Sequence, residues 1–593
     1  MEVSRLLAKT GLFASLAPLT LEQLADRTRT RLFRSGDTVI KPGADADHLF
    51  IVAIGRLRVV AGDGTLINDI GRLEPVGEIS LLSGEKRTTT VYAVRDSVLL
   101  EITRADLFTV FERNPTALLA LTRTVIARFR HGQRASLLAA ARHARCFAVV
   151  AAHDGLDPGA FAKAFETALR LEGKNVQRID AASVDQALGP SMSNTPFGQV
   201  RPEARLIDYL HQQEMDFDHL IYVASAAPGP WTRRCMRQAD RVLMLADASA
   251  APADSPQLLD LKNHPVRARL DVVLLRDQTE APVDSLGWRN RIGASDHFFL
   301  RPQQDDDIRG IARSLTGQAL GLVLGGGGAR GFAHIGLIRA LEESGIAVDV
   351  VGGTSMGAFI GALLASGHDS TQILEITRQT FVERNLLNDF LFPRVSLIRG
   401  RKVRLRLEEI FGERLIEELH TPYFCVSTNL SRGRAMVHRS GRLSTWVGTS
   451  MSVPGVAPPV VYQGDLLVDG AVVNSLPTDV MQSLERGPII ASDVSTEGTV
   501  AAPGIDGPDP EGLLNWDAED KRPSLLSILF RTATLTSESG VERRAARADL
   551  YLRMPVAEAG MFDWKKLDEI VERGYQHAME RLPGFKSQVL NKA

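Results

Sequence analysis

Two glycine-rich turns, at residues 325–331 and 353–357, constrain the fold of this 593-residue chain more than any other feature. Each turn follows a short run of mainly apolar residues, 322–324 and 348–351, that is typical of a buried strand. Each turn is followed by a stretch whose apolar residues recur at helical spacing. Consecutive strand–turn–helix units predict a parallel α/β sheet, with any chemistry at the carboxyl ends of its strands.

The first turn, taken alone, is compatible with a dinucleotide site. Gly326, Gly328 and Gly331 match the spacing G-x-G-x-x-G. Asp349 lies in the next expected strand, close to where a dinucleotide fold keeps the acid that binds the ribose. One interpretation is therefore a dinucleotide-dependent enzyme, which would bind a cofactor and would lack a serine that reacts with fluorophosphonates.

The second turn indicates a nucleophile instead. Ser355 stands between Gly353 and Gly357 in a G-x-S-x-G pattern, in which the glycines avoid steric clashes and leave the serine hydroxyl exposed. The first turn would then be an oxyanion hole, with N–H groups that face the charge on an attacked carbonyl. A serine also needs a base, and Asp469 ends a later apolar run, 466–468.

Three motifs in this order, G-G-G-x-R-G, G-x-S-x-G and D-G-A, resemble those of the patatin-like phospholipases. The resemblance covers roughly residues 318–590 and implies a catalytic dyad, in which Asp469 activates Ser355 and later a water molecule. Ala471 stands where many members of the family have glycine. The resemblance also implies an oxyanion segment made of Gly326, Gly327, Gly328 and Arg330.

A Ser–His–Asp triad is the alternative to this dyad, and it would need a histidine late in the chain. His577 is the only histidine beyond Asp469, and it lies in a polar stretch near the end of the chain. His334 follows the first glycine turn, where we expect it to pack or to support the turn rather than act as a base. The dyad is the preferred interpretation.

The amino-terminal part, residues 1–131, alternates short apolar runs with glycine turns, which is typical of a small β-barrel or jelly roll. Residues 76–91 combine the start of a short helix with an arginine and a hydroxyl, as a phosphate site requires. This stretch resembles the phosphate-binding cassette of cyclic-nucleotide-binding domains. The alternative is a barrel without a ligand, in which the glutamate and arginine form only a salt bridge. The resemblance assigns Gly77 and Glu78 to the ribose 2′-hydroxyl, Arg87 to the cyclic phosphate and Thr88 to a phosphate oxygen.

A connecting helix to about residue 141 leads into residues 142–312, where strand-like and helical stretches alternate. This alternation predicts a second, Rossmann-like parallel α/β sheet. Asp218 and Asp240 precede two of its strands and resemble positions in ATPases of the chromosome-partitioning type. However, the loop at residues 153–159 has no lysine and no G-K-[ST], so phosphate binding is unsupported. We expect a structural or regulatory module without a functional P-loop.

The net charge, the cysteines and the length of the apolar runs restrict which partners and which cellular compartment we expect. The formal net charge of −2 gives no reason to expect nucleic acid. Cys146, Cys235 and Cys425 lie in apolar stretches without metal-ligand spacing, which fits a reducing compartment and predicts no metal site. No run approaches the ~18–20 apolar residues of a membrane span. We therefore expect a cytoplasmic protein that reaches a membrane from its surface, at the inner face.

Two stretches of the catalytic region are candidates for contact with lipid. Residues 399–406 contain five cationic side chains in eight, which could attract anionic headgroups or form the solvated face of a helix. Residues 525–530 follow a loop expected at 498–523, and their apolar surface could lie in a membrane interface or pack in a core or dimer.

The sequence thus predicts a cyclic-nucleotide-binding barrel domain at 1–131, a Rossmann-like α/β module at 142–312 and a patatin-like serine hydrolase domain at 316–593. This arrangement resembles the neuropathy-target-esterase branch of the patatin family. That resemblance implies hydrolysis of fatty-acyl esters in lysophospholipids or phospholipids, no catalytic cofactor, and cyclic AMP or cyclic GMP as a regulatory ligand. The chain could also form homo-oligomers. The alternative is a nucleotide-sensing scaffold whose hydrolase domain is silent.

Overall fold

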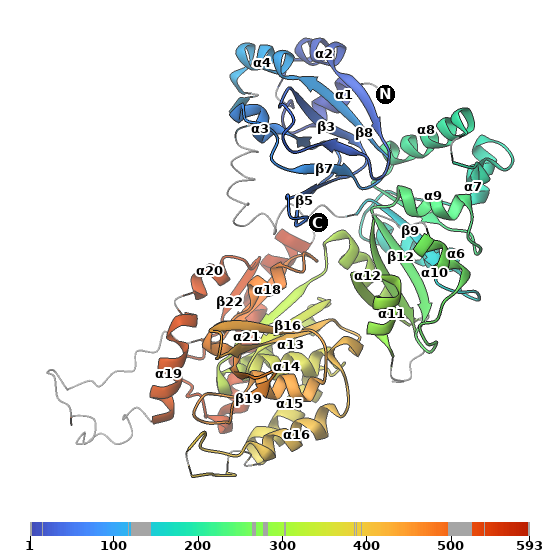
Figure 1. The fold of residues 1–593 in the computed structure, drawn as a ribbon. Helices are drawn as coiled ribbons and strands as arrows, with labels where there is room; N and C mark the ends of the chain where they lie inside the picture. The colour runs from blue at the N-terminus through green and yellow to red at the C-terminus, as the bar shows by residue number, and fades with distance from the viewer. Residues whose placement is uncertain are drawn as a thin grey trace. The chain divides into compact units, whose positions relative to one another are not determined.

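The computed structural model describes residues 3–590 except 15, 117, 120–121, 123–143, 198, 264–267, 277–282, 302–303, 385, 387, 393, 496–510, 512–524 and 539. The chain divides into two compact units, Met1–Thr316 and Gly317–Ala593 (Figure 1). The first unit contains a barrel and a parallel sheet, and the second contains the sheet that carries both glycine turns.

The amino-terminal barrel consists of two antiparallel four-stranded sheets, ordered β1-β8-β3-β6 and β2-β7-β4-β5. Strand β3 is buried on both faces: Phe50 and Val52 contact the opposite sheet, whereas Leu49 and Ile51 pack against the helices. The predicted barrel is therefore confirmed. Its elements are α1 (Val3–Lys9), α2 (Pro18–Arg27), β1 (Arg29–Phe33), β2 (Thr38–Ile40), β3 (His48–Ile54), β4 (Leu57–Val60), β5 (Leu66–Ile70), β6 (Pro75–Val76), α3 (Glu78–Ser83), β7 (Thr90–Ala93), β8 (Ser97–Thr103) and α4 (Arg104–Arg113).

The central region is a parallel six-stranded sheet in the order β10-β11-β9-β12-β13-β14, as the alternating pattern predicts (Figure 1). Alternate residues of β9 enter two separate cores, Ala148 and Val150 on one face, Phe147 and Val149 on the other. Helices therefore cover both faces, as in a broadly Rossmann-like fold. The elements are β9 (Cys146–Ala151), α6 (Pro158–Leu171), β10 (Val176–Ile179), α7 (Ala181–Leu188), α8 (Val200–Asp216), β11 (His219–Val223), α9 (Pro230–Gln238), β12 (Arg241–Asp247), α10 (Pro256–Asn263), β13 (Arg269–Leu275), α11 (Ser285–Ile292), β14 (Asp296–Leu300) and α12 (Asp305–Thr316).

The loop after β9 differs from a phosphate-binding loop in what occupies the start of helix α6. The Asp157 carboxylate accepts hydrogen bonds from the N–H groups of Gly159 and Ala160, at 2.8 and 3.1 Å. The N-terminus of a helix attracts anions because its first N–H groups lack partners within the helix. Here the chain supplies its own anion at the position where a P-loop would hold phosphate.

A buried ion-pair network joins the barrel to the central region within the first unit. The Arg95 guanidinium donates to both Glu214 carboxylate oxygens at 2.7 and 2.8 Å, and to Asp240 at 2.8 Å. Next to it, Asp96 accepts from Arg237 at 2.9 Å. Asp240, which resembled an ATPase residue in the sequence, therefore has a structural partner.

The second unit is built on an eight-stranded sheet, ordered β19-β20-β17-β16-β15-β21-β22, with β18 paired to β17. Strands β17, β16, β15, β21 and β22 are parallel, while β18, β20 and β19 run antiparallel to their neighbours. The strands are β15 (Gly321–Leu324), β16 (Val350–Thr354), β17 (Tyr423–Asn429), β18 (Arg434–His438), β19 (Val460–Tyr462), β20 (Asp465–Asp469), β21 (Ile489–Asp493) and β22 (Leu550–Arg553). The helices are α13 (Ala333–Glu343), α14 (Met356–Ala365), α15 (Ser370–Thr377), α16 (Arg401–Phe411), α17 (Leu443–Ser450), α18 (Thr478–Gln482), α19 (Leu525–Glu538), α20 (Val541–Ala545) and α21 (Leu567–Phe585).

Strands β15 and β16 are paired neighbours, so the two glycine turns meet at the same edge of the sheet. Strand β16 begins at Val350, two residues later than the expected strand at 348–351. Asp349 therefore precedes the strand, and its carboxylate accepts from the Leu320 N–H at 2.9 Å. This contact lies at the amino end of β15, opposite the glycine turns. The acid that the dinucleotide interpretation needs is thus at the wrong end of the sheet.

Several expected features fall wholly or partly outside the described residues. The connecting helix is described as α4 up to Arg113, but residues 123–143 are not described. Most of the loop expected at 498–523 is not described either. Helix α19 begins at Leu525, but of the apolar side chains expected at its surface only Ile528 is described. In the part of the chain that is described, no helix is both long and apolar enough to cross a membrane.

Candidate active site

Ser355 occupies the sharp turn between β16 and α14, with φ 55° and ψ −122°. A Cβ atom at Gly353 would collide with the Gly357 carbonyl oxygen, and a Cβ at Gly357 would collide with the Leu324 carbonyl oxygen. The two glycines of the motif are therefore required by close backbone approach. The Ser355 N–H donates to Ser450 Oγ at 3.0 Å, which holds the turn in place. A non-glycine residue at positive φ is strained, and such strain is found at functional sites.

Asp469 ends β20 and lies beside this serine. The Ser355 hydroxyl donates to Asp469 Oδ2 at 2.6 Å, and the Ala471 N–H donates to Oδ1 at 2.8 Å. The carboxyl group is fully buried. Burial raises its pKa to about 7, against the opposing effect of the two hydrogen bonds. A carboxylate with this pKa is a stronger base than an exposed aspartate, and it is still ionised above neutral pH.

The four residues of the expected oxyanion segment have different surroundings. A Cβ at Gly326 would lie 3.2 Å from Ser355 Cβ, so glycine lets the loop approach the serine. However, the Gly326 N–H donates to the Ser475 carbonyl at 3.0 Å. In this conformation that N–H is not available to an oxyanion, so Gly326 serves the site through its small size.

Arg330 contacts the same loop through the Gly327 carbonyl. It is buried, its pKa is lowered by desolvation, and its Nε donates to the Gly327 carbonyl at 3.3 Å. In a trans peptide the following N–H points away from the carbonyl, so Arg330 orients the N–H of Gly328. Gly328 has φ 59° and lines the same cavity as Ser355. Of the four residues in the expected oxyanion segment, Gly328 is the one that lines this cavity, which makes its N–H a candidate for binding an oxyanion.

Neither histidine considered from the sequence is the partner of the Ser355 hydroxyl, because that partner is Asp469. His334 is buried between the Gly325 carbonyl and Ser492 Oγ, each 2.8 Å from one of its ring nitrogens. Burial lowers its pKa to about 4, so it is neutral and ties the glycine loop to β21. His577 lies in α21, where burial lowers its pKa.

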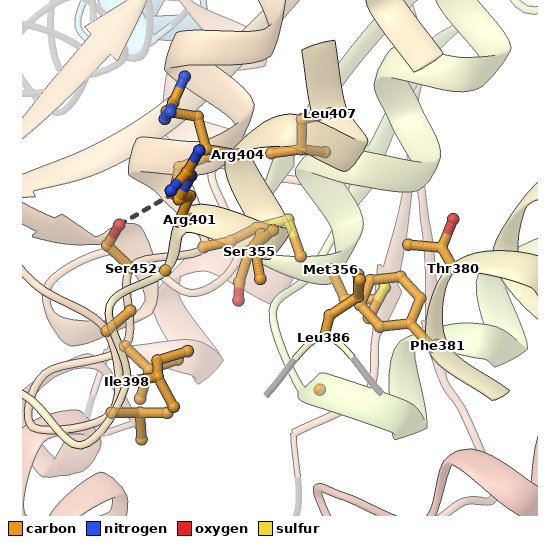
Figure 2. A pocket seen from close by; sticks show the side chains of 18 of the residues that line it. Ser355, Met356, Thr380, Phe381, Leu386, Ile398, Arg401, Arg404, Leu407 and Ser452 are labelled. Atoms are coloured by element: carbon orange, nitrogen blue, oxygen red, sulfur yellow. Dashed lines mark hydrogen bonds between the residues drawn. The ribbon is translucent and has the colours of Figure 1, made fainter. Parts of the chain in front are cut away.

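Ser355 opens into a cavity of about 810 Å³ (Figure 2). Its walls are mainly apolar, and Figure 2 shows Met356, Phe381 and Leu386 around the serine. The apolar lining also includes Ile398, Val403, Leu407, Met451, Val453, Val456, Met561, Phe562 and Trp564. The charged lining residues are Arg384, Arg399, Arg401, Arg404 and Lys565, with Glu383 and Glu408.

The candidate nucleotide residues form one compact cassette in the barrel. Gly77 has φ 88°, and a Cβ there would lie 2.6 Å from Arg87 Nη1. The buried Arg87 guanidinium donates to the carbonyls of Gly77 and His48, both at 2.5 Å. Glu78 begins α3 and is buried, whereas Thr88 is exposed. Desolvation lowers the pKa of Arg87, and a bound anion would stabilise such a buried cation.

One residue of the site and one neighbouring segment were not singled out from the sequence. Ser450 holds the Ser355 turn, and its only sequence signal is its place in an S-M-S-V-P-G stretch. The segment that carries Phe390 and Phe392 next to the cavity was also missed, although two aromatic residues in a largely apolar stretch between Asp389 and Arg399 are a visible signal.

Profiles of three protein families match this chain in succession. The cyclic nucleotide-binding domain matches residues 30–114, and the neuropathy target esterase family P-loop like domain matches residues 143–317. The patatin-like phospholipase profile matches residues 322–481, which include Ser355 and Asp469.

Curated relatives match over nearly the whole chain. Patatin-like phospholipase domain-containing protein 7 of Rattus norvegicus is 31% identical, over 92% of this chain and 44% of the relative. Patatin-like phospholipase domain-containing protein 6 of Homo sapiens is 30% identical, over 94% and 45%. Lysophospholipase NTE1 of Yarrowia lipolytica is 28% identical, over 92% and 45%. The chain thus spans less than half the length of these relatives.

Proposed function

Because the chain belongs to the patatin-like phospholipase family and carries the domains of its neuropathy-target-esterase branch, we propose that it is a serine esterase acting on fatty-acyl esters of lysophospholipids or phospholipids. The observation that carries the proposal is the 2.6 Å hydrogen bond from Ser355 Oγ to the buried Asp469 carboxylate. Nucleophilic catalysis by serine requires a base in contact with its hydroxyl, and the Asp469 carboxylate occupies that position.

The first half-reaction transfers the acyl group to the enzyme. Ser355 Oγ attacks the ester carbonyl carbon while Asp469 Oδ2 takes the hydroxyl proton. The carbonyl oxygen becomes an oxyanion that the Gly328 N–H, oriented through Arg330, can stabilise. When the tetrahedral intermediate collapses, the carbon–oxygen bond to the alcohol breaks. The leaving oxygen receives the proton from Asp469.

The second half-reaction releases the fatty acid. Asp469, ionised again, takes a proton from a water molecule, whose oxygen attacks the acyl-enzyme carbonyl. The bond to Ser355 Oγ then breaks, and the serine oxygen recovers the proton from Asp469. One buried carboxylate thus serves as base and acid in both halves.

The cavity supports a lipid substrate over a peptide. Its apolar walls fit an acyl chain, which makes no hydrogen bonds and whose transfer out of water is favourable. Arg401 and Arg404 of α16 lie among its charged lining residues (Figure 2). A guanidinium is suited to a phosphate headgroup, so these residues support a phosphate-bearing ester.

Fluorophosphonate labelling and hydrolysis of a lysophospholipid test the dyad. We expect wild type to be labelled, Ser355→Ala to lose both labelling and hydrolysis, and Asp469→Asn to lose both by about a hundredfold or more. Asp465→Asn removes a carboxylate from the same strand, where it pairs with Arg432 at the surface, and should keep full activity. A wild type that neither labels nor hydrolyses, with or without lipid, would favour the silent scaffold instead.

We also propose that cyclic AMP or cyclic GMP binds the barrel and regulates hydrolysis. The cassette of Gly77, Glu78, Arg87 and Thr88 supports binding, because it combines a buried cation with the start of a helix. The Arg95 network supports transmission, because it joins the barrel to the central region.

A further inference from the structure

A hairpin beside the active-site cavity presents apolar side chains to solvent. The exposed fractions are 71% for Phe390, 83% for Phe392 and 68% for Val395, and Leu391 is also exposed. Single exposed apolar residues are ordinary, but four within six positions form a patch that needs a partner. The hairpin, defined here by residues 389–392 and 394–399, follows the π-helical turn Arg378–Glu383 in the chain and precedes helix α16.

The hairpin is firmly attached at its base. Phe390 and Ile398 form an antiparallel bridge, and the Arg399 N–H donates to the Asp389 carbonyl at 2.9 Å. The Asp389 carboxylate accepts from the N–H of Arg401 at 2.9 Å, which connects the hairpin to the start of α16. The Ile398 N–H donates to the Val456 carbonyl at 3.0 Å. The aromatic side chains therefore project from a fixed base.

The charges around the patch indicate which partner fits it. Residues 390–405 contain no acidic residue and five cations, all exposed to solvent. These cations are Arg394, Arg399, Arg401, Lys402 and Arg404. Aromatic residues between cations match the interface of an anionic bilayer, where rings enter the headgroup level and cations meet the phosphates.

The hairpin is also continuous with the cavity. Leu386 precedes the hairpin, Ile398 and Arg399 end it, and all three line the cavity that holds Ser355 (Figure 2). The base of the hairpin therefore forms part of the wall of the cavity that holds the serine.

We propose that this hairpin is the membrane-docking element of this protein, which inserts Phe390 and Phe392 into the surface of an anionic lipid bilayer. This inference rests on the proposed function, because it specifies how the hydrolase domain would meet its lipid. The cations of α16 would bind headgroups at the same surface. Docking would place the cavity against the membrane during catalysis.

Flotation of the full chain with vesicles tests the docking independently of hydrolysis. The Ser355→Ala protein is mixed with vesicles of phosphatidylcholine alone or with about one third phosphatidylglycerol. We expect preference for the anionic vesicles. Adding Phe390→Ser and Phe392→Ser should lower partitioning about tenfold or more on both. Adding Arg394→Ala and Lys402→Ala, neither of which lines the cavity, should remove the preference for anionic lipid.

Leu171→Ser is the matched control, because Leu171 is 71% exposed but lies at the end of α6 in the first unit. It should leave partitioning unchanged, and all variants should unfold at the wild-type temperature. With Ser355 present, the double phenylalanine variant should hydrolyse a dissolved short-chain ester at the wild-type rate and a vesicle-borne ester about tenfold more slowly.

Unchanged vesicle partitioning in the double phenylalanine variant would overturn the proposal. Loss of self-association in that variant, with vesicle partitioning intact, would also overturn it and assign the patch to a second copy of the chain. Hairpin-dependent vesicle binding by a wild type that hydrolyses no ester would support docking and reject the proposed function.

Discussion

At the scale of single residues, the site depends on a carboxylate that burial makes basic. Asp469 has no exposed surface, and its pKa of about 7 lies well above the usual range for aspartate. Between the unfolded pKa and about 7, the folded state binds more protons than the unfolded state, so this group's contribution to stability falls as pH rises. The fold therefore accepts a stability cost near neutral pH for a base that can activate Ser355.

The same pKa predicts the pH dependence of hydrolysis. Because only the ionised Asp469 can take the serine proton, kcat/KM should fall tenfold per pH unit below about 7 and level off above it. A pH profile on a dissolved ester measures this. Asp465→Asn, with its surface carboxylate removed, should show the same profile. An acidic limb centred near the ordinary aspartate pKa would contradict the buried base.

At the scale of elements, a buried ionic network connects the barrel to the central region of the first unit. Arg95 follows the barrel strand β7, whereas Glu214 lies in α8 and Asp240 immediately precedes β12. All three side chains are buried, so each charge depends on the others for compensation. Removal of one member of such a network leaves uncompensated charge in a medium of low dielectric constant.

Arg95→Met should therefore destabilise the first unit by about 3–5 kcal/mol. Chemical denaturation of the full chain, followed by a probe in the first unit, measures the loss. Arg31→Met is the matched control. Arg31 also forms an ion pair, with Glu101, but the Arg31 side chain is 53% exposed. That control should cost less than about 1 kcal/mol. Equal effects of the two substitutions would show that the Arg95 network adds no stability.

At the scale of the whole molecule, the proposed regulation by a cyclic nucleotide would start at the barrel. The nucleotide cassette and Arg95 lie on either side of β7, which runs from Thr90 to Ala93. A change at the cassette is therefore only one strand away from the contact with the central region. The expected connecting helix is not needed for that first step.

Arg87→Ala should weaken binding of cyclic nucleotide at least about tenfold and abolish any nucleotide effect on hydrolysis, because it removes the cation that would meet the cyclic phosphate. Titration calorimetry with cyclic AMP and cyclic GMP measures the affinity. Lys86→Ala, at the exposed neighbouring position, should keep it. Wild-type affinity in Arg87→Ala would show that the cassette does not bind the nucleotide.

The sequence by itself determined the local backbone. The strand–turn–helix pattern predicts the two glycine turns, and the alternation of strand-like and helical stretches in 142–312 predicts the parallel sheet. The motif order also predicted the match of residues 322–481 to the patatin-like phospholipase profile. These features are readable because apolar spacing and glycine placement within one stretch indicate the local element before its tertiary partners are known.

Only the tertiary structure decided what surrounds each residue. It placed Asp349 at the amino end of the sheet, engaged the Gly326 N–H with Ser475, and exposed Phe392 beside the cavity. It also buried Asp469, and so set its pKa. Burial and hydrogen-bond partners come from segments far apart in the sequence, and desolvation depends on all of them together. A pattern of residue types cannot contain that information until the chain has folded.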